Sequence, residues 1–453
     1  MAKVEKRILN RVEGEIELKL VWEKERIKDA FIIAPNFRGF EFILENKPLL
    51  DALVITPRIC GICGHAHLIA TTNALENLYR ENGYEIEVSQ KAQFIRNITL
   101  SCEIIQNHIR WFYLFVIPDF LKFNTDLKDF YPIKGEKWRK AVYYSSKIVK
   151  VIAIFGGQWP HTSYSIPGGV MCEPTQMELM EAISIVDNVL EYFENDVIGM
   201  NIEDYFSIKS LEEFLEKSKG DLKTIIEEAI KLGFSDIGKA YNRFLTVCNV
   251  NPFISQGVKR RKKCNFDVNK VEEIETFSFL ENGKSKFSKR KYSWAKAPRY
   301  EGKPFETGPL ARRINNEDEL FINLTKNYKG YYIPRIWARV DEIGKILVAI
   351  KKYLLNINLD EPSYIKPKID IKNLEGQAYG FCEAARGSLI HKVIAKDGKI
   401  EKYDVITPTV WNLGTRCKNY LSPVEKAIIG LNDKLKAEMI VRSFDVCSVC
   451  TTH

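Results

Sequence analysis

The sequence predicts a mainly α-helical fold with a minor β component (α+β), formed as a single body over residues 1–453. Apolar residues recur at steps of three and four from about Gln90 to Phe115, which is the spacing of one helix face. Apolar and polar residues alternate within 14–34 and 388–407, as they do in strands with one buried face. The Lys/Ser/Asn-rich stretch near 257–300 is the main shift in composition, and it predicts an exposed insertion.

The expected elements follow from these patterns in chain order. Residues 14–34 should form a β-hairpin, and Pro35–Glu45 should turn from strand to helix. Within 388–407 the strands should turn at Asp397-Gly398, a dipeptide suited to tight hairpins. Pro423 should begin a final helix that runs to about Leu435, because proline is accepted in the first turn of a helix. Further helices are expected over residues 66–81, 90–115, 136–155, 175–195, 222–233 and 338–356.

Composition restricts the class of protein. Charged residues make up 28% of the chain and leave a net charge of +8, but Lys and Arg are spread along it. This distribution predicts a solvated surface and no nucleic-acid partner. The N-terminus has no secretory signal pattern, and no apolar stretch has the roughly 18–20 residues of a membrane-spanning helix. We therefore expect a cytoplasmic protein with no transmembrane segment, unless a partner carries it to a membrane.

Four of the ten cysteines form two Cys-x-x-Cys pairs, Cys60 with Cys63 and Cys447 with Cys450. Such a pair places two thiolates within reach of one metal ion. Soft thiolate ligands suit zinc, iron–sulfur iron, nickel or copper(I), and ligand type alone favours a structural zinc site. The pairs lie near opposite ends of the chain, however, whereas structural zinc sites usually join a short local loop.

Neighbouring residues favour a catalytic metal. His67 follows Cys63 by four positions, and His453 follows Cys450 by three. Arg58 precedes the first pair and Asp445 precedes the second. A closed zinc site has no need of such groups, whereas a catalytic metal needs them to orient its ligands and to move protons.

The motifs around the two pairs resemble those of nickel–iron hydrogenase large subunits. Arg58–His67 is similar to the family's Arg-x-Cys-Gly-x-Cys-x-x-x-His. Asp445–His453 is similar to Asp-Pro-Cys-x-x-Cys-x-x-His, with Val446 in place of the usual proline. The likeness continues in family order through Arg11–Gly14, Phe37–Glu41, Gly156–His161, Gly168–Val170, Gly308–Arg312, Ala385–Gly387 with His391, and Pro408–Asn412.

The resemblance implies the large helical-bundle body of this family and a nickel–iron centre. Cys60 and Cys447 would be terminal nickel ligands. Cys63 and Cys450 would bridge nickel to an iron atom that carries carbon monoxide and two cyanide ligands. Thiolates are electron-rich, so they support changes in nickel oxidation state, and one of them could accept a proton when H2 is split.

The resemblance also implies a separate cation and a set of supporting residues. Glu41, His453 and the backbone carbonyl of Val405 would bind magnesium (or iron). The other residues implied at the nickel–iron centre are Glu13 as the proton carrier, Arg386 above the metals, Asp445 as its charge partner, Thr409 as a hydroxyl donor to cyanide, and Ala385 and Pro408 as neighbours that line the cofactor.

Besides Val446, one further position departs from the family's pattern. The family often has His-Asp-His on the long helix after the first motif, whereas this chain has Gln106-Asn107-His108. A neutral Asn107 removes a charge near the expected arginine. No role follows for His65, which we expect at the surface.

The expected function is H2 oxidation, the reversible conversion of H2 into two protons and two electrons. No further cysteine group has the spacing of an iron–sulfur site, so electrons would pass to an iron–sulfur small subunit. Maturation proteins would build the centre, and the heterodimer could pair into a dimer of heterodimers. An alternative is a regulatory H2 sensor that signals to a kinase through the same metal site. A remote alternative is a structural four-cysteine zinc protein.

Overall fold

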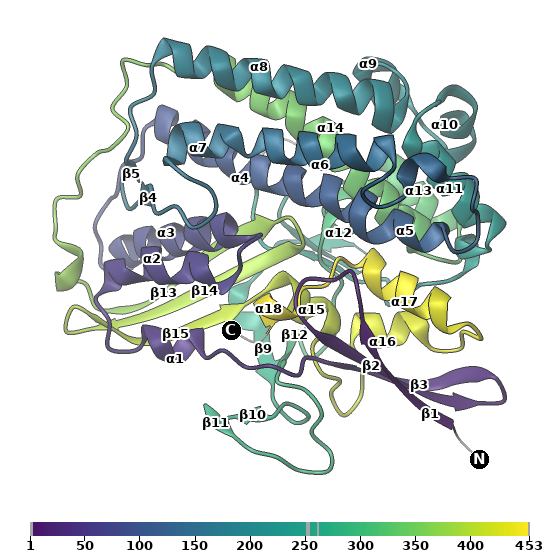
Figure 1. Cartoon of the computed structure of the whole chain (residues 1–453). Coiled ribbons are helices and arrows are strands. Elements are labelled where there is room, and N and C mark those ends of the chain that lie inside the picture. Colours follow the sequence, from purple (N-terminus) through teal and green to yellow (C-terminus); the bar gives the residue numbers. More distant parts are fainter. Residues whose placement is uncertain (1–2, 251–253, 261, 452–453) are drawn as a thin grey trace.

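The computed structural model of the chain describes residues 3–250, 254–260 and 262–451. Long helices form one side of the molecule, and small antiparallel sheets form the other (Figure 1). The fold is mainly α with a minor β component, which confirms the predicted class.

The helical side is organised around α4, which spans Gln90–Arg110. Its residues Ile98, Cys102 and Ile105 are buried, as their helical spacing predicts. The chain continues from α4 into a π-helical turn, η3, at Trp111–Val116. Helices that pack with α4 or with one another beside it are α6 (Glu136–Ile148), α7 (Lys150–Gly156), α8 (Gln176–Tyr192) and α14 (Tyr332–Leu355).

A three-stranded sheet packs against α3, which spans Gly64–Glu81. The sheet has the strand order β13–β14–β15. At Gly380 a Cβ atom would lie 1.9 Å from the carbonyl oxygen of Ala70, so glycine permits the close approach of α3 to β13. The three strands are β13 (Gly376–Ala384), β14 (Gly387–Lys396) and β15 (Lys399–Ile406).

A second three-stranded sheet carries the N-terminal part of the chain and extends from one end of the body (Figure 1). Strands β2 (Ile16–Glu23) and β3 (Arg26–Ile33) form the hairpin that the sequence predicts. Strand β1 (Lys3–Leu9) pairs with β2 and was not predicted, because its charged residues mask the alternation.

Several predicted helix boundaries were wrong. The helix expected over 136–155 divides at Val149 into α6 and α7. The helix expected from Pro423 to Leu435 ends at Ile428 as α16, and Gly430 adopts a φ of 87° before α17 begins at Lys434. Helix α14 begins at Tyr332, earlier than the predicted 338.

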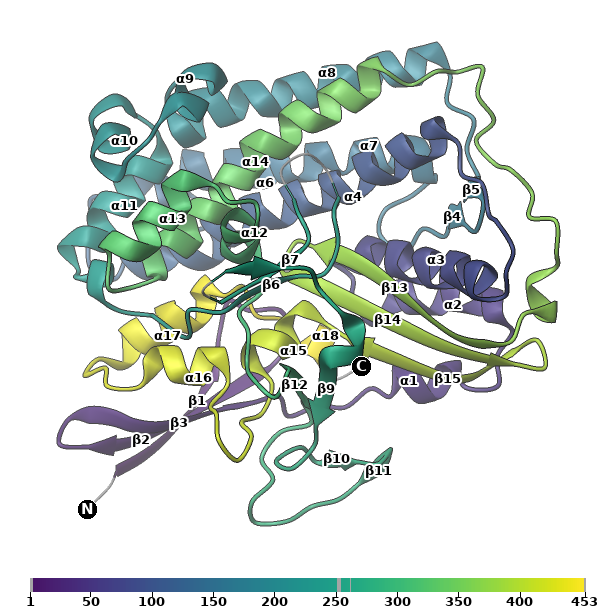
Figure 2. The same cartoon turned by 180° about the vertical axis from the view of Figure 1, so that it is seen from behind.

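The segment 257–300 forms short strands. Val258, Leu280 and Ala297 within it are buried, while the β10–β11 hairpin projects from the body (Figure 2). Its elements are β7 (Gly257–Lys259), β8 (Lys263–Cys264), η7 (Val268–Lys270), β9 (Val271–Ile274), β10 (Leu280–Glu281), β11 (Lys284–Ser285) and β12 (Ala297–Tyr300). The single domain over 1–453 and the insertion stay predictions.

The remaining elements each have eleven residues or fewer. They are α1 (Phe40–Leu44), η1 (Leu49–Asp51), α2 (Ala52–Ile55), η2 (Thr56–Ile59), α5 (Ile117–Phe120), η4 (Lys128–Phe130), β4 (Ser165–Ile166), β5 (Gly169–Val170), η5 (Phe193–Ile198), α9 (Ile202–Ser207), α10 (Leu211–Lys217), α11 (Asp221–Lys231), η6 (Phe234–Asp236), β6 (Phe244–Thr246), α12 (Pro309–Asn315), α13 (Glu319–Asn327), η8 (Ile371–Asn373), α15 (Pro408–Leu413), α16 (Pro423–Ile428), α17 (Lys434–Ser443) and α18 (Ser448–Thr451). Within the described residues, none of these helices combines the length and the apolar character that crossing a bilayer requires.

Candidate metal centre

The structure brings the four paired cysteines together in the interior. The Sγ atoms of Cys63 and Cys450 lie 3.1 Å apart, and those of Cys447 and Cys450 lie 3.3 Å apart. The sulfurs of Cys60, Cys447 and Cys450 all lie within 4.8 Å of one another. The four side chains are at most 6% exposed, and all four thiols are free of disulfides. This donor set fits a metal that accepts soft sulfur ligands.

Local structure at both ends of the chain creates this cluster. Cys63 is the residue before α3, and at Gly64 a Cβ atom would lie 2.4 Å from the carbonyl oxygen of Pro57. Glycine therefore lets the first cysteine pair fold tightly against η2. The second pair is held by a parallel bridge between Cys447 and Glu13, where the Ser448 N–H donates to the Glu13 carbonyl at 2.9 Å.

The four thiols shift one another's pKa values. Hydrogen bonds from Cys447, Cys450 and Cys63 hold the pKa of Cys60 well below its ordinary value. The corresponding bonds to Cys447, Cys60 and Cys63 hold the pKa of Cys450 well above it. Metal binding at this cluster would release protons, because the thiolate and not the thiol is the metal ligand.

Arg386 lies beside the cysteines and pairs with Asp445. Its Nε donates to Asp445 Oδ1 at 3.2 Å, and its Nη1 is buried without a hydrogen-bond partner. Burial opposes the charge of Arg386, but Asp445 and then Cys447 keep its pKa well above the ordinary value. A buried donor without a partner is costly, so this atom fits a small acceptor ligand on a metal held by the cysteines.

Two further groups touch Asp445, and sequence reasoning did not assign them a role. Asn107 Nδ2 donates to Asp445 Oδ2 at 2.7 Å. Arg339 Nε lies 3.8 Å from the same oxygen, and burial lowers the pKa of Arg339 to about 10. Asn107 was noticed in the sequence as a departure from a motif, whereas Arg339 lies in an apolar helix with no motif around it.

Glu13 is half-buried beside the same cluster. Burial raises its pKa, Arg386 lowers it, and Cys60 raises it again. Thr409 is buried, and its Oγ1 accepts the backbone N–H of Cys447 at 3.2 Å. Pro408 begins α15 next to it, and Ala385 lies buried at the end of β13.

The predicted cation ligand Glu41 lies in a separate polar pocket. Its Oε1 accepts the Val405 N–H at 2.8 Å, and its Oε2 lies 3.5 Å from Lys296 Nζ. Lys296 Nζ also lies 3.1 Å from Glu273 Oε2. Sequence reasoning missed Glu273 and Lys296, because both fall in the segment expected to be exposed. The predicted ligand His453 lies outside the described residues.

The histidines are buried in hydrogen-bond networks. His67 Nδ1 lies 3.0 Å from His391 Nε2, and His391 Nδ1 lies 2.8 Å from the Tyr403 hydroxyl. His65 is 3% exposed, so its expected surface position was wrong. Its Nε2 lies 2.9 Å from Thr99 Oγ1, and burial lowers its pKa to about 3.

A buried ion-pair network fixes the elements around Arg386. Arg312 Nε and Nη2 contact the two carboxylate oxygens of Glu342 at 2.7 and 2.6 Å. Its Nη1 lies 3.1 Å from Glu383 Oε2. His108 Nε2 lies 3.1 Å from Glu342 Oε2. These groups join α12, α14, β13 and α4 in the interior.

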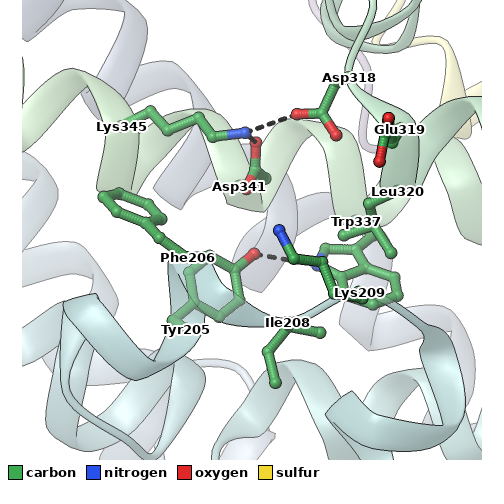
Figure 3. Close-up of a pocket in the computed structure, with 10 residues that line it drawn as sticks. All are labelled: Tyr205, Phe206, Ile208, Lys209, Asp318, Glu319, Leu320, Trp337, Asp341 and Lys345. Atoms are coloured by element: carbon green, nitrogen blue, oxygen red, sulfur yellow. Dashed lines mark hydrogen bonds and ion pairs between the residues drawn. The ribbon is translucent and has the colours of Figure 1, made fainter.

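Another cavity, of about 320 Å³, lies between α9, α13 and α14 (Figure 3). Lys345 Nζ lies 2.8 Å from Asp318 and 2.9 Å from Asp341, and the Trp337 N–H donates to the Tyr205 hydroxyl at 2.9 Å. The cavity shares no lining residue with the cysteine cluster. These polar groups pair with one another, so the cavity supplies no group to the metal centre.

Comparison with known proteins identifies the family. The family described as nickel-dependent hydrogenase matches residues 38–130 and 133–453. The chain therefore belongs to the nickel-dependent hydrogenase family, within which it is a large subunit. This confirms the predicted family and the predicted class of enzyme.

Similar proteins cover nearly the whole chain. The large subunit of the periplasmic [NiFeSe] hydrogenase of Desulfomicrobium baculatum is 27% identical, over 98% of this chain and 93% of its own. The hydrogenase-2 large chain of Escherichia coli (strain K12) is 25% identical, over 98% and 96%. Among solved structures, the oxidized Ni-Fe-Se hydrogenase of D. vulgaris Hildenborough has a TM-score of 0.85 at 23% identity, covering 100% of both chains.

Proposed function

We propose that this chain oxidises H2 to protons and electrons at a nickel–iron centre held by Cys60, Cys63, Cys447 and Cys450. The observation that carries the proposal is the convergence of four buried thiols beside Arg386, whose Nη1 has no hydrogen-bond partner. When bound, the nickel–iron pair supplies the electrophilic metal site at which H2 is polarised and split.

The cysteines divide into two roles in this proposal. Cys63 and Cys450, whose sulfurs lie 3.1 Å apart, would be the two thiolates shared by nickel and iron, as the family resemblance implies. Cys60 and Cys447 are terminal ligands to nickel. The Arg386 guanidinium offers donors to the cyanide and carbon monoxide ligands of the iron. The Thr409 hydroxyl offers a donor of its own, since its oxygen already accepts the Cys447 N–H.

Glu13 is the proposed carrier of protons away from the cysteines. Its backbone is fixed against Cys447 and Ser448, so its carboxyl lies next to the cluster. Burial disfavours its charged form, which suits a carboxyl that must accept and then release a proton.

Glu41, the Val405 carbonyl and His453 are the proposed ligands of a magnesium (or iron) ion. The N–H and C=O groups of one strand residue point to the same side, so the Val405 carbonyl faces the side on which its N–H meets Glu41. The carboxylates of Glu41 and Glu273 match the oxygen ligands that magnesium prefers.

Electrons would leave to an iron–sulfur small subunit. The loop between Cys60 and Cys63 reaches the surface, where Gly61 is exposed and a Cβ atom added to it would have no atom within 4 Å. A partner can therefore approach the centre closely at this loop. Maturation proteins that insert the metals, and a location in the cytoplasm, are further parts of the proposal.

Metal analysis with infrared spectroscopy of the purified heterodimer tests the proposal. We expect nickel together with an excess of iron, because the clusters of the small subunit add to the iron of the centre, and we expect bands from metal-bound carbon monoxide and cyanide. H2-dependent dye reduction should be lost when Cys450 is replaced by Ala. Fully metallated protein without these bands, or a chain that contains zinc alone, would overturn the proposal.

A further inference from the structure

Asp445 receives more contacts than its pairing with Arg386 requires. Asn107 Nδ2 donates to its Oδ2 at 2.7 Å, and Arg339 Nε lies 3.8 Å from the same oxygen. All four residues are at most 3% exposed. Burying these groups away from water is costly, so their arrangement must be specified by the surrounding elements.

Helices α4 and α14 both hold the segment that leads to Cys447. Trp111 begins the π-helical turn after α4, and its indole N–H donates to the Arg442 carbonyl at 2.8 Å. The Arg339 guanidinium lies 4.3 Å from the Trp111 ring centroid, a cation–π distance. Arg339 Nη1 also donates to the Ser443 carbonyl at 3.1 Å.

The charges in this group do not balance. Within the part of the chain that the structure describes, Asp445 is the one carboxylate in ion-pair contact with either Arg339 or Arg386. Asn107 is neutral, so two guanidinium groups share one carboxylate. The surplus positive charge of these contacts lies beside the cysteines and the half-buried Glu13, and the cysteine thiolates raise the pKa of Arg386.

We propose that Asn107 and Arg339 are positioning residues of the metal centre. Asn107 fixes the Asp445 carboxylate through a neutral donor, and Arg339 shares that carboxylate. Arg386 thereby keeps a surplus positive charge toward the thiolates and the small electron-rich ligands they help to hold. This inference rests on the proposed function and adds to it two residues and the sign of the local charge.

The Asn107→Asp and Arg339→Met variants of the holoenzyme test the inference, because each lowers the local charge by one through a different residue. Both should move the carbon monoxide and cyanide bands in the same direction, to lower frequency. Both should lower kcat for H2 oxidation about tenfold, the effect of losing one hydrogen bond to a charged group, and should leave KM for H2 within about twofold. Asn107→Ala should lower kcat with a smaller band shift.

Asn97→Asp is the matched control, since Asn97 is half-buried on the same helix and contacts Gln93. Bands in Asn107→Asp and Arg339→Met that coincide with those of this control would overturn the inference. If Asn107→Asp accumulates without metal, its free energy of unfolding should fall below that of Asn97→Asp. Equal values would also overturn the inference. Absence of metals and bands from the wild-type heterodimer would instead overturn the proposed function.

Discussion

At the scale of single residues, the backbone of Glu13 has a structural role and its side chain has a proposed chemical role. Its carbonyl accepts the Ser448 N–H at 2.9 Å and thereby anchors the second cysteine pair. Its side chain is half-buried and carries a raised pKa, caused first by burial. A substitution that keeps the backbone and the shape of the side chain therefore tests the chemistry alone.

We predict that Glu13→Gln lowers kcat for H2 oxidation by about 10²–10⁴-fold, because an amide cannot relay a proton as a carboxyl does. Nickel and iron content should stay equal to that of wild type. Dye-reduction kinetics and metal analysis measure the two quantities. Glu15→Gln is the control, because Glu15 is exposed two positions further along the chain. Equal kcat values in the two variants would contradict the role of Glu13.

Individual residues differ in how far the sequence could reveal them. The paired cysteines, Glu13, Glu41 and Arg386 stand in short motifs, and the structure places all but Glu41 around one cluster. Glu273 and Lys296 stand in no motif, and their meeting with Glu41 depends on the pairing of β9 with β12. Contacts made by pairing distant short strands leave no local pattern, so they could not be predicted.

At the scale of elements, the start of α3 is held by a carboxyl from α4. Glu103 accepts the backbone N–H groups of His65 and Ala66 at 2.8 and 3.0 Å. Burial nevertheless raises its pKa to about 8, although these two bonds lower it. The folded protein therefore keeps a proton on Glu103 that the unfolded chain loses near its ordinary pKa of 4.5.

This difference predicts a pH-dependent stability. The contribution of Glu103 to the free energy of unfolding falls as pH rises between 4.5 and about 8, and it is constant above that range. Glu103→Gln should flatten this decline, because an amide does not titrate. Urea denaturation across this pH range measures the slope. Glu87→Gln, at an exposed position before α4, should retain the wild-type slope.

The junction of α12, α14 and β13 depends on Arg312. We predict that Glu342→Gln lowers the free energy of unfolding by about 3–5 kcal/mol, because it leaves a buried guanidinium short of a counter-charge. The same substitution at Glu213, which pairs with Lys217 at the surface, should lower the free energy of unfolding far less. Denaturation midpoints compare the two variants, and similar losses would contradict the prediction.

Element type was predicted better than element boundaries. The spacing of apolar residues in α4 was sufficient to predict a helix, because the buried residues recur at helical intervals. The break at Gly430 and the π-helical turn at Trp111 are set by tertiary contacts, including the bond from the Trp111 indole to Arg442. Strand β13 was missed because it is buried on both faces near its end, so alternation is lost there.

At the scale of the whole molecule, the two ends of the chain must meet for the cluster to form. Gly14 lies at this meeting point with a φ of 75°, and a Cβ atom there would lie 2.4 Å from Ser448 Oγ. The chain that carries Cys447 and Cys450 can pack against Glu13 only because residue 14 has no side chain.

We predict that Gly14→Ala greatly lowers the nickel content of the purified protein, because the methyl group displaces the second cysteine pair. Gly233→Ala is a matched control, since Gly233 has a φ of 77° and no atom within 4 Å of the added methyl. Both variants place an alanine in a left-handed backbone conformation. A difference in nickel content between them therefore reports the steric clash at residue 14. Equal nickel in both would contradict the prediction.

Two of the four cysteines lie at residues 60–63 and two at 447–450, so the two pairs are synthesised at different times. A ribosome releases the first pair when most of the chain is still to be made, and the second pair emerges hundreds of residues later. With the four cysteines as the proposed ligands, nickel that arrives early would find half of them and no enclosing interior. Complete loading is therefore confined to the period after translation has passed Cys450, and a polypeptide that stalls before then cannot sequester the metal in a finished centre.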